Sequence, residues 1–196
     1  MCRRTEMAQR SVTLASRRSW PGACWPGLSD RWDHTREVAA RAQSVATAVP
    51  DEERRLLVDA AWLHDIGYSA EVSRTGFHPL NGARYLRSIG ASPDLVGAVA
   101  HHSCARFEAA ERGLARDLEA FSAPSEAVMD ALAYADMTTG PTGLGVNVED
   151  RLAEILERYG SDDPVHRAIS RARVDLMTAV RRTEIRLAAT AVDHPM

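Results

Sequence analysis

Residues 62–67 read WLHDIG, in which a histidine and an aspartate stand side by side at the end of an apolar helical stretch that stops at a glycine. A charged side chain in apolar surroundings must be paired or must bind a metal ion. Adjacent residues on a helix point about 100° apart, so both side chains can bind an ion only if it lies against the helix flank. The stretch therefore predicts that further ligands come from other parts of the chain.

The chain has helical periodicity almost throughout from residue 30 onward. Pro50 ends the first predicted helix, and Pro79 and Pro93 each stand at a favourable first helical position. The predicted helices cover 30–48, 51–67, 79–90, 93–103, 126–138, 149–159 and 164–190. No stretch alternates as a strand would. We therefore expect an all-α fold, a multi-helix bundle around a buried metal site.

Composition divides the chain into three segments. Residues 1–28 are arginine-rich early and Trp-, Pro- and Gly-rich late, without a helical period, which indicates a disordered extension or a start codon assigned too early. A basic arm that binds a partner is the alternative. Residues 29–145 contain the predicted metal-binding core. Residues 146–196 are expected to form C-terminal helices that pack on this core, and these helices could also form the interface of a homodimer.

The bulk composition is that of an ordinary globular protein: 196 residues, 45% hydrophobic and 26% charged, with a formal net charge of −3. This charge argues against binding a nucleic-acid polymer through bulk electrostatics. Three cysteines without CxxC spacing predict free thiols in a reducing compartment. No run reaches the roughly 18 apolar residues of a membrane span, and no secretory h-region is present. We therefore expect a cytoplasmic protein without a membrane partner.

Five of the seven histidines fall between residues 34 and 102, and an aspartate ends a later apolar helix. These candidates are His34, His64, His78, His101, His102 and, in ALAYADMTTG, Asp136. Imidazole and carboxylate ligands together suit a divalent transition ion such as Fe, Mn, Zn, Co or Ni better than Ca²⁺. One or two ions could be held if the helices close around the site, and Asp65 could bridge two ions.

The pattern resembles the HD superfamily of metal-dependent phosphohydrolases over about residues 30–140. The resemblance rests on His34, on His64-Asp65 in LHDIG and on Asp136 in YAD, and it implies that these residues are the core metal ligands. Members with a larger site add two histidines between the HD pair and the last aspartate. In this chain GFHPLNGARYL supplies His78, and LVGAVAHH supplies the other.

The histidine pair 101–102 leaves a choice of ligand. His102 follows Val99 by three residues and Leu95 by seven, on the apolar stripe of its predicted helix, so we expect His102 to be the ligand. The predicted set of six ligands is then His34, His64, Asp65, His78, His102 and Asp136. His101 would line the pocket or donate a hydrogen bond to a substrate phosphate. The predicted catalytic residues are therefore Asp65 and His101.

A phosphate substrate also needs cationic or hydroxyl donors. Arg106, one turn beyond His102, is the best placed arginine, and Arg74 and Arg84 come next. Each of them could instead be a solvated surface residue. Thr138 and Thr139 follow Asp136 and could donate to the same anion, or they could cap the turn into GPTG.

The resemblance implies a phosphohydrolase that acts on a nucleotide or another small phosphate ester or anhydride. The six-ligand set is similar to that of the HD-type dinucleoside tetraphosphate hydrolases. The HD-type mixed-valent di-iron oxygenases show a similar string of HDIG followed by H-x-x-x-GAxxL, so an oxygenase is an alternative. A non-catalytic HD domain that senses a ligand is another.

The sequence also departs from several HD patterns. Tyr68 stands where many HDIG proteins have lysine, which removes any role of that lysine. No GYP motif follows, which argues against a cyclic-di-GMP phosphodiesterase of the HD-GYP kind. The acidic pair soon after HD that marks the alarmone hydrolases is also missing.

Overall fold

The helices of the protein begin and end close to the prolines, glycines and capping residues of the sequence. The computed structural model describes residues 29–193. In chain order, its α-helices are α1 (Ser29–Ser44), α2 (Arg54–Leu63), α3 (His78–Ser88), α4 (Pro93–His101), α5 (Arg106–Glu111), α6 (Ala115–Leu118), α7 (Glu126–Met137), α8 (Val148–Arg158) and α9 (Pro164–Asp193). The predicted all-α fold is confirmed, since residues 29–193 contain no strand beyond one isolated bridge.

Side-chain caps fix three of the helix starts. The hydroxyl groups of Ser92 and Ser125 accept hydrogen bonds from backbone N–H groups at the starts of α4 and α7, and the Asn147 side chain does the same for α8. These caps satisfy donors that a helix N-terminus otherwise leaves without partners. They set where α4 and α7 start; the predicted ligand His102 directly follows α4, and Asp136 lies in the last turn of α7.

The structure departs from the predicted helix boundaries in several places: α1 ends at Ser44 and is followed by a 3₁₀ turn at Ala46–Ala48, and α4 ends at His101. The short helices α5 and α6 were not predicted. The predicted helix 51–67 is broken into a 3₁₀ turn at Asp51–Glu53, then α2, and then the 3₁₀ turn η5 (Ile66–Tyr68). The His64-Asp65 pair therefore lies where a regular helix ends and the chain turns, rather than in mid-helix.

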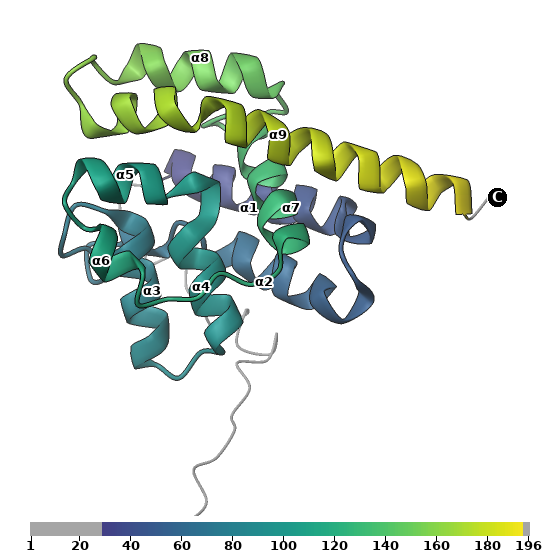
Figure 1. Cartoon of the computed structure of the whole chain (residues 1–196), viewed down its shortest axis with the longest axis horizontal. Helices are drawn as coiled ribbons and strands as arrows, with labels where there is room; N and C mark the ends of the chain where they lie inside the picture. The colour runs from purple at the N-terminus through teal and green to yellow at the C-terminus, as the bar shows by residue number, and fades with distance from the viewer. Residues whose placement is uncertain (1–28, 194–196) are drawn as a thin grey trace, which may run out of the picture.

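Helix α7 lies between two apolar clusters that form the core (Figure 1). On one side, Ala131, Leu132 and Ala135 pack with buried residues of α1, α2, α3 and α4. On the other side, Ala133 and Met137 pack with buried residues of α8 and α9, which lie side by side along one face of the bundle. Many of the buried residues on α1 and α2 are alanines, whose small side chains allow these two helices to pack closely.

An ion-pair cluster also fastens α9 to α7. The Asp130 carboxylate is almost fully buried, accepts two hydrogen bonds of 2.8 Å from Arg182, and accepts a third of 2.8 Å from Arg186. The C-terminal helices thus pack on the remainder of the bundle through both apolar and charged contacts. The segment boundaries at residues 28 and 145 and the homodimer stay predictions, and residues 1–28 lie outside the described part of the chain.

Residues 29–193 contain no helix that combines the length and the apolar character needed to cross a bilayer. The longest, α9, has 30 residues but carries charged residues along its whole length.

Gly67 allows η5 to lie directly on the start of α3. A Cβ atom built on Gly67 would stand 1.9 Å from the carbonyl oxygen of His78 and 2.7 Å from the backbone nitrogen of Gly82. Both neighbours are backbone atoms, which cannot rotate away as a flexible side chain can. The glycine of HDIG is therefore required by the close approach that places His78 beside the His64-Asp65 turn.

Replacing Gly67 by alanine should separate η5 from α3 and lower the free energy of unfolding by about 3 kcal/mol, since the added methyl group overlaps backbone. Urea denaturation would measure the loss. Gly160→Ala is the matched control, because its added Cβ meets no atom within 4 Å. The control should stay within about 1 kcal/mol of wild type. A Gly67→Ala protein as stable as this control would contradict the close approach.

Candidate metal centre

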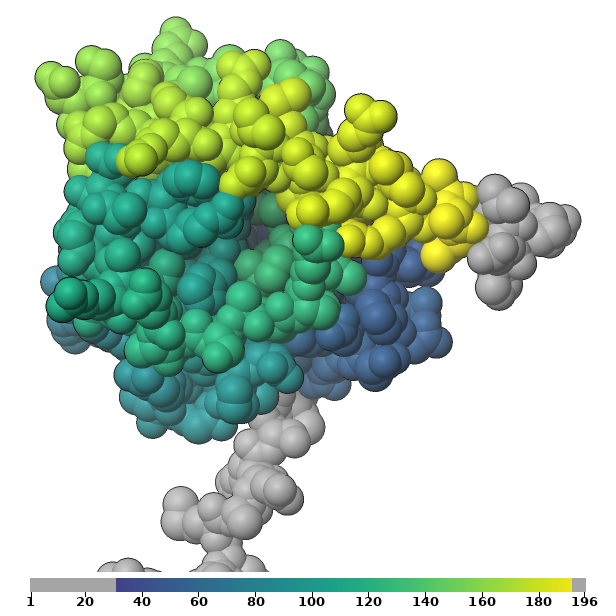
Figure 2. Space-filling model, viewed as in Figure 1, coloured from purple at the N-terminus to yellow at the C-terminus, as the bar shows by residue number. Residues whose placement is uncertain are grey.

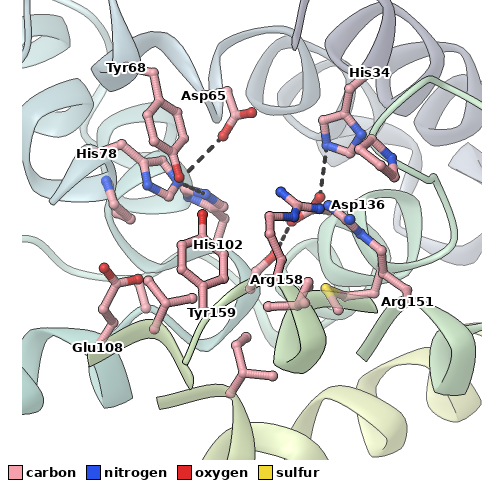
Figure 3. A pocket seen from close by; sticks show the side chains of 18 of the residues that line it. His34, Asp65, Tyr68, His78, His102, Glu108, Asp136, Arg151, Arg158 and Tyr159 are labelled. Carbon is pink, nitrogen blue, oxygen red and sulfur yellow. Dashed lines mark hydrogen bonds and ion pairs between the residues drawn. The ribbon is translucent and has the colours of Figure 1, made fainter. Parts of the chain in front are cut away.

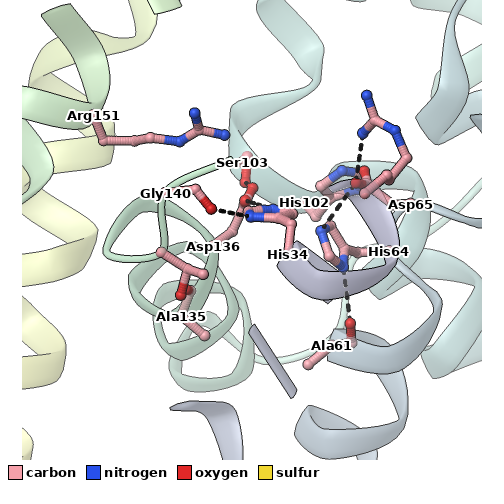
Figure 4. Close-up of polar contacts among 12 residues, drawn as sticks. His34, Ala61, His64, Asp65, His102, Ser103, Ala135, Asp136, Gly140 and Arg151 are labelled. Carbon is pink, nitrogen blue, oxygen red and sulfur yellow. Dashed lines mark hydrogen bonds and ion pairs between the residues drawn. The ribbon is translucent and has the colours of Figure 1, made fainter. Parts of the chain in front are cut away.

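Five helices bring the six predicted ligands to one place. His34 comes from α1, the His64-Asp65 pair follows α2, His78 begins α3, His102 follows α4, and Asp136 lies in the last turn of α7. They form two groups of three whose ligand atoms all lie within 4.8 Å of one another. The first ligand group is His34, His64 and Asp136, and the second ligand group is Asp65, His78 and His102. Figures 3 and 4 show the two groups facing a common space.

Backbone carbonyl groups orient three of the four imidazoles. The Nδ1 atom of His34 lies 2.9 Å from the oxygen of Gly140, and that of His64 lies 2.8 Å from the oxygen of Ala61 (Figure 4). The Nδ1 atom of His102 lies 2.7 Å from the oxygen of Val99. A carbonyl oxygen only accepts, so each Nδ1 must carry the proton and donate it. The Nε2 atoms are then left with a lone pair directed into the site, as in histidines that bind metal.

Asp65 lies between the two ligand groups. Its Oδ2 atom is 3.6 Å from Nε2 of His64, in the first ligand group, and its Oδ1 atom is 3.4 Å from Nε2 of His78, in the second. One carboxylate oxygen therefore faces each group. This is the arrangement that a carboxylate bridging two ions requires.

The residues present fit one or two divalent cations. Nε2 of His64 is buried and has no hydrogen-bond partner among the described residues, and its close neighbour Oδ2 of Asp65 is also an acceptor. Nε2 of His34 likewise faces Oδ1 of Asp136 at 3.1 Å. An imidazole nitrogen with a lone pair and a carboxylate oxygen are both acceptors, so in a buried space they need a proton or a cation between them. Imidazole and carboxylate donors suit Zn, Fe, Mn, Co or Ni.

The charges of the site follow from burial and from close neighbours. Burial opposes the ionisation of Asp65, but His64, His78 and Arg31 hold the pKa of its carboxyl group well below the usual range. Burial lowers the pKa of His78 and of His102, which keeps these imidazoles neutral. Burial would also lower the pKa of His34, but the hydrogen bond and charge of Asp136 raise it above 6.5. The Asp136 carboxylate therefore favours the protonated form of the His34 imidazole.

A strained turn presents a hydroxyl group to Asp136. Ser103 has φ 47° and ψ 41°, and Cys104 has φ 58°, both in the left-handed region that L-residues rarely adopt. The Ser103 hydroxyl donates to Oδ2 of Asp136, on the opposite side of the carboxylate from His34 (Figure 4). Backbone strain of this kind tends to cluster at functional sites.

Arg31 and Tyr68 support the second ligand group and were not predicted. The Arg31 guanidinium donates a 2.7 Å hydrogen bond to Oδ2 of Asp65 and lies 3.6 Å from the centre of the Tyr68 ring. The other face of that ring stacks on His78, with ring centres 3.9 Å apart. Tyr68 thus holds the His78 imidazole from the side. Arg31 stands three residues before His34 on α1, and that spacing could have placed it on the same helix face.

The structure does not bring His101 to the ligand groups, so its predicted catalytic role needs correction. Nε2 of His101 lies 2.6 Å from the carbonyl oxygen of Phe121, on the far side of the chain from His102. His101 lines a separate lateral cavity between α4, α7 and α9, visible as a hollow in Figure 2. The reason is geometric, since adjacent helical residues diverge by about 100°.

The predicted substrate donors also lie elsewhere. Arg106 pairs with Asp175 of α9 and lines the lateral cavity, because α4 ends at His101 and the left-handed residues 103 and 104 then turn the chain. Arg74 is exposed and donates to carbonyl oxygens of its own loop, Ala70, Glu71 and Ser73. Arg84 pairs with Asp117 at the surface.

The two threonines after Asp136 act as caps. The Thr138 hydroxyl donates to the carbonyl oxygen of Tyr134 at 2.7 Å, and the Thr139 hydroxyl donates to that of Ala135 at 2.8 Å. Neither residue lines the cavity at the ligand groups. The predicted role of Thr138 in substrate binding is therefore replaced by the capping alternative.

A cavity of about 490 Å³, which we call the central cavity, opens directly onto both ligand groups (Figure 3). Its opposite wall comes from the C-terminal helices, with Arg151, Glu154 and Arg158 of α8 and the following Tyr159. Ile155, Val165 and Ile169 add apolar surface to this wall. Sequence reasoning missed this wall, because the α8 pattern does not tell which helix face meets the site.

A scan of protein families finds that the family described as "HD domain" matches residues 31–137. The match includes all six ligand residues and ends one residue after Asp136. Searches of curated proteins and of solved structures return no match.

The structure predicts opposite effects for the neighbouring histidines 101 and 102. His102→Ala removes a ligand of the second group and should weaken metal binding by about 100-fold or more, beyond the usual loss from an outer-shell change. His101→Ala should leave metal binding unchanged, since that side chain lies outside both groups. Isothermal titration with Mn²⁺ or Zn²⁺ would measure both. Equal losses in the two variants would contradict the assignment.

Metal occupancy should fall in two steps as the pH is lowered. His34 must lose its proton to bind a cation, and its raised pKa means that the first ligand group weakens already above pH 6.5. His78 and His102, with lowered pKa values, should keep the second ligand group competent below pH 6.5. Elemental analysis after dialysis between about pH 8 and about pH 5 would show the steps.

Asp136→Asn provides the control for this titration. This substitution removes a charged ligand from the first group while keeping the shape of the side chain. The first group should then bind no ion, so the loss of metal at higher pH should no longer be seen. If the wild-type protein lost both ions in one step, the first ligand group would not lose metal at a higher pH than the second, and the prediction would be wrong.

Proposed function

The chain belongs to the HD-domain family, and from that premise we propose that it is a metal-dependent phosphohydrolase acting on a nucleotide or another small phosphate ester or anhydride. The proposed cofactor is one or two divalent transition ions from the set Fe, Mn, Zn, Co and Ni. The observation that carries the proposal is the pair of three-residue ligand groups, with Asp65 between them, at the end of one open cavity.

The ligand geometry suits hydrolysis at a phosphorus atom. Bound ions would lower the pKa of a coordinated water toward neutrality and would offset charge on the phosphoryl oxygens. Ligand atoms within 4.8 Å of one another in each group allow one ion per group. Asp65, with one oxygen toward each group, would fix the separation of the two positions.

Residues around the ligands would hold them in this geometry. Arg31 pairs with Asp65 and keeps that carboxylate ionised and oriented. Ser103 and His34 approach Asp136 from two sides, which fixes its rotamer. The carbonyl groups of Ala61, Gly140 and Val99 keep three imidazoles in the tautomer that can bind a metal. The site is therefore already oriented before substrate binds, and little reorganisation accompanies the reaction.

The cavity favours an anionic substrate of modest size. A volume of about 490 Å³ suits a small molecule and is too small for a folded polymer. The wall opposite the ligands contains Arg151 and Arg158, which pair with Glu154 of the same wall and could exchange that carboxylate for a phosphate, whereas a small apolar diatomic substrate would need no such donors. This wall favours the hydrolase over the di-iron oxygenase that the same ligand set could support.

Chelator-free protein loaded with Mn²⁺, Co²⁺ or Ni²⁺ should release phosphate from one or more members of a panel of nucleotides and small phosphate esters. Asp65→Asn should reduce kcat/KM by about 10³-fold or more, because it removes the bridging charge. Asp117→Asn is the matched control, since that exposed carboxylate pairs with Arg84 far from the cavity.

Two other results would reject the hydrolase. Oxygen consumption by the iron-loaded protein, without phosphate release under any metal, would assign the site to an oxygenase. Tight binding of a small molecule without turnover under any metal would assign it to a sensor.

A further inference from the structure

Helix α8 carries three charged residues on the face that closes the central cavity. Arg151, Glu154 and Arg158 are spaced three and four residues apart, so they lie along one side of the helix. All three line the cavity opposite the ligand groups, and Figure 3 shows Arg151 and Arg158 there. They stand outside the family match, which ends at residue 137. Whatever they do is therefore added to the HD domain by the C-terminal part of this chain.

Arg151 is a buried cation with a donor that no described protein group uses. Its side chain is only 10% exposed, and its Nε atom is buried without a hydrogen-bond partner among the described residues. Its charge also acts on the metal centre. Burial opposes the ionisation of Asp136, and after His34 and His64, Arg151 helps to hold the pKa of that carboxyl group low. A buried guanidinium with a free N–H beside such a site would bind an anion favourably.

Glu154 joins the two arginines. Arg151 donates to Oε2 of Glu154, and the Nε atom of Arg158 donates to Oε1 at 2.8 Å. Partial burial opposes the ionisation of Glu154, but Arg158 and Arg151 lower its pKa below the ordinary value. The two guanidinium groups therefore converge on a single carboxylate. The carboxylate itself is 37% exposed, so it can turn toward solvent when another anion arrives.

We propose that Arg151 and Arg158 form an anion clamp that binds the non-bridging oxygens of a substrate phosphate, and that Glu154 occupies this clamp until the phosphate displaces it. The proposal rests on the proposed function and extends it to the substrate. Two guanidinium groups that share one carboxylate can share one phosphate in the same manner, with N–H donors in matching pairs.

The other residues of this cavity wall indicate the chemistry of the organic part of the substrate. Ile155, Val165 and Ile169 lie beside the clamp and present apolar surface, and Tyr159 adds an aromatic ring. The substrate class is thus a phosphate ester or anhydride whose organic part is apolar or aromatic. The phosphate would face both the ligand groups and α8, and the organic part would lie along α8 and the start of α9.

Isothermal titration of inorganic phosphate into Mn²⁺-loaded protein tests the clamp without any need for turnover. Arg151→Gln should weaken phosphate binding by about tenfold or more, since it removes a charged donor. Arg158→Gln should also weaken phosphate binding. This second variant tests the clamp if the buried substitution at residue 151 prevents folding. Glu154→Gln should instead tighten phosphate binding several-fold, because it removes the competing carboxylate.

Arg171→Gln is the matched control. This arginine also pairs with a glutamate, Glu111 of α5, but lies outside the central cavity. The control should bind phosphate as wild type does. Phosphate binding is compared at saturating Mn²⁺ in every variant, since the charge of Arg151 also acts on Asp136. In turnover with a phosphate ester, Arg151→Gln should raise KM more than it lowers kcat.

The opposite signs distinguish a clamp from a merely structural ion-pair network. Phosphate affinity that is unchanged in Arg151→Gln, or weakened as much by Glu154→Gln as by Arg151→Gln, would overturn the clamp. A wild-type protein that binds no phosphate would overturn it as well. If the protein hydrolyses no phosphate ester but still binds phosphate through Arg151, the proposed function fails and the clamp stands. If it hydrolyses esters and Arg151→Gln binds phosphate normally, the clamp alone fails.

Discussion

The structure depends on the burial of two carboxylates and four imidazoles where five helices meet. Polar groups in such a place are costly unless each has a partner. Backbone carbonyl groups satisfy one nitrogen of His34, His64 and His102, which forces the other nitrogen to present a lone pair to the site. These lone pairs then face carboxylates or each other, and a divalent cation could satisfy them together. The bundle around them, with its alanine-rich contacts and the close approach at Gly67, holds the five helix ends at the required separation.

Much of this site could be predicted because its signals are local. The HD pair at the end of an apolar helix, His78 before a proline, and His102 on the apolar stripe of its helix each follow from spacing along a single element. The structure places all six predicted ligands within two adjacent groups. The helices were predicted for a similar reason, since Pro79 and Pro93 mark the starts of two helices.

The sequence was less informative where the pattern along one helix does not tell which way a side chain points. Arg106 would lie one turn beyond His102 if α4 continued, but Ser103 and Cys104 adopt left-handed conformations, and α5 then carries Arg106 to Asp175. Neither residue is a glycine, so nothing in the sequence marked that turn. The wall of α8 was missed for a different reason. Its charged face looks like a solvated surface until the packing of α8 and α9 on α7 turns it toward the cavity.

The molecule therefore combines a candidate metal centre, built from the helices within the family match, with a cavity wall from the C-terminal helices. Anomalous X-ray scattering from crystals grown with Mn²⁺ would locate the bound ions and so decide whether the metal centre exists. We expect two peaks about 3.5–4 Å apart, one among His34, His64 and Asp136 and the other among Asp65, His78 and His102. Anomalous density only at surface carboxylates, with His64 Nε2 hydrogen-bonded to a protein group instead, would contradict this assignment.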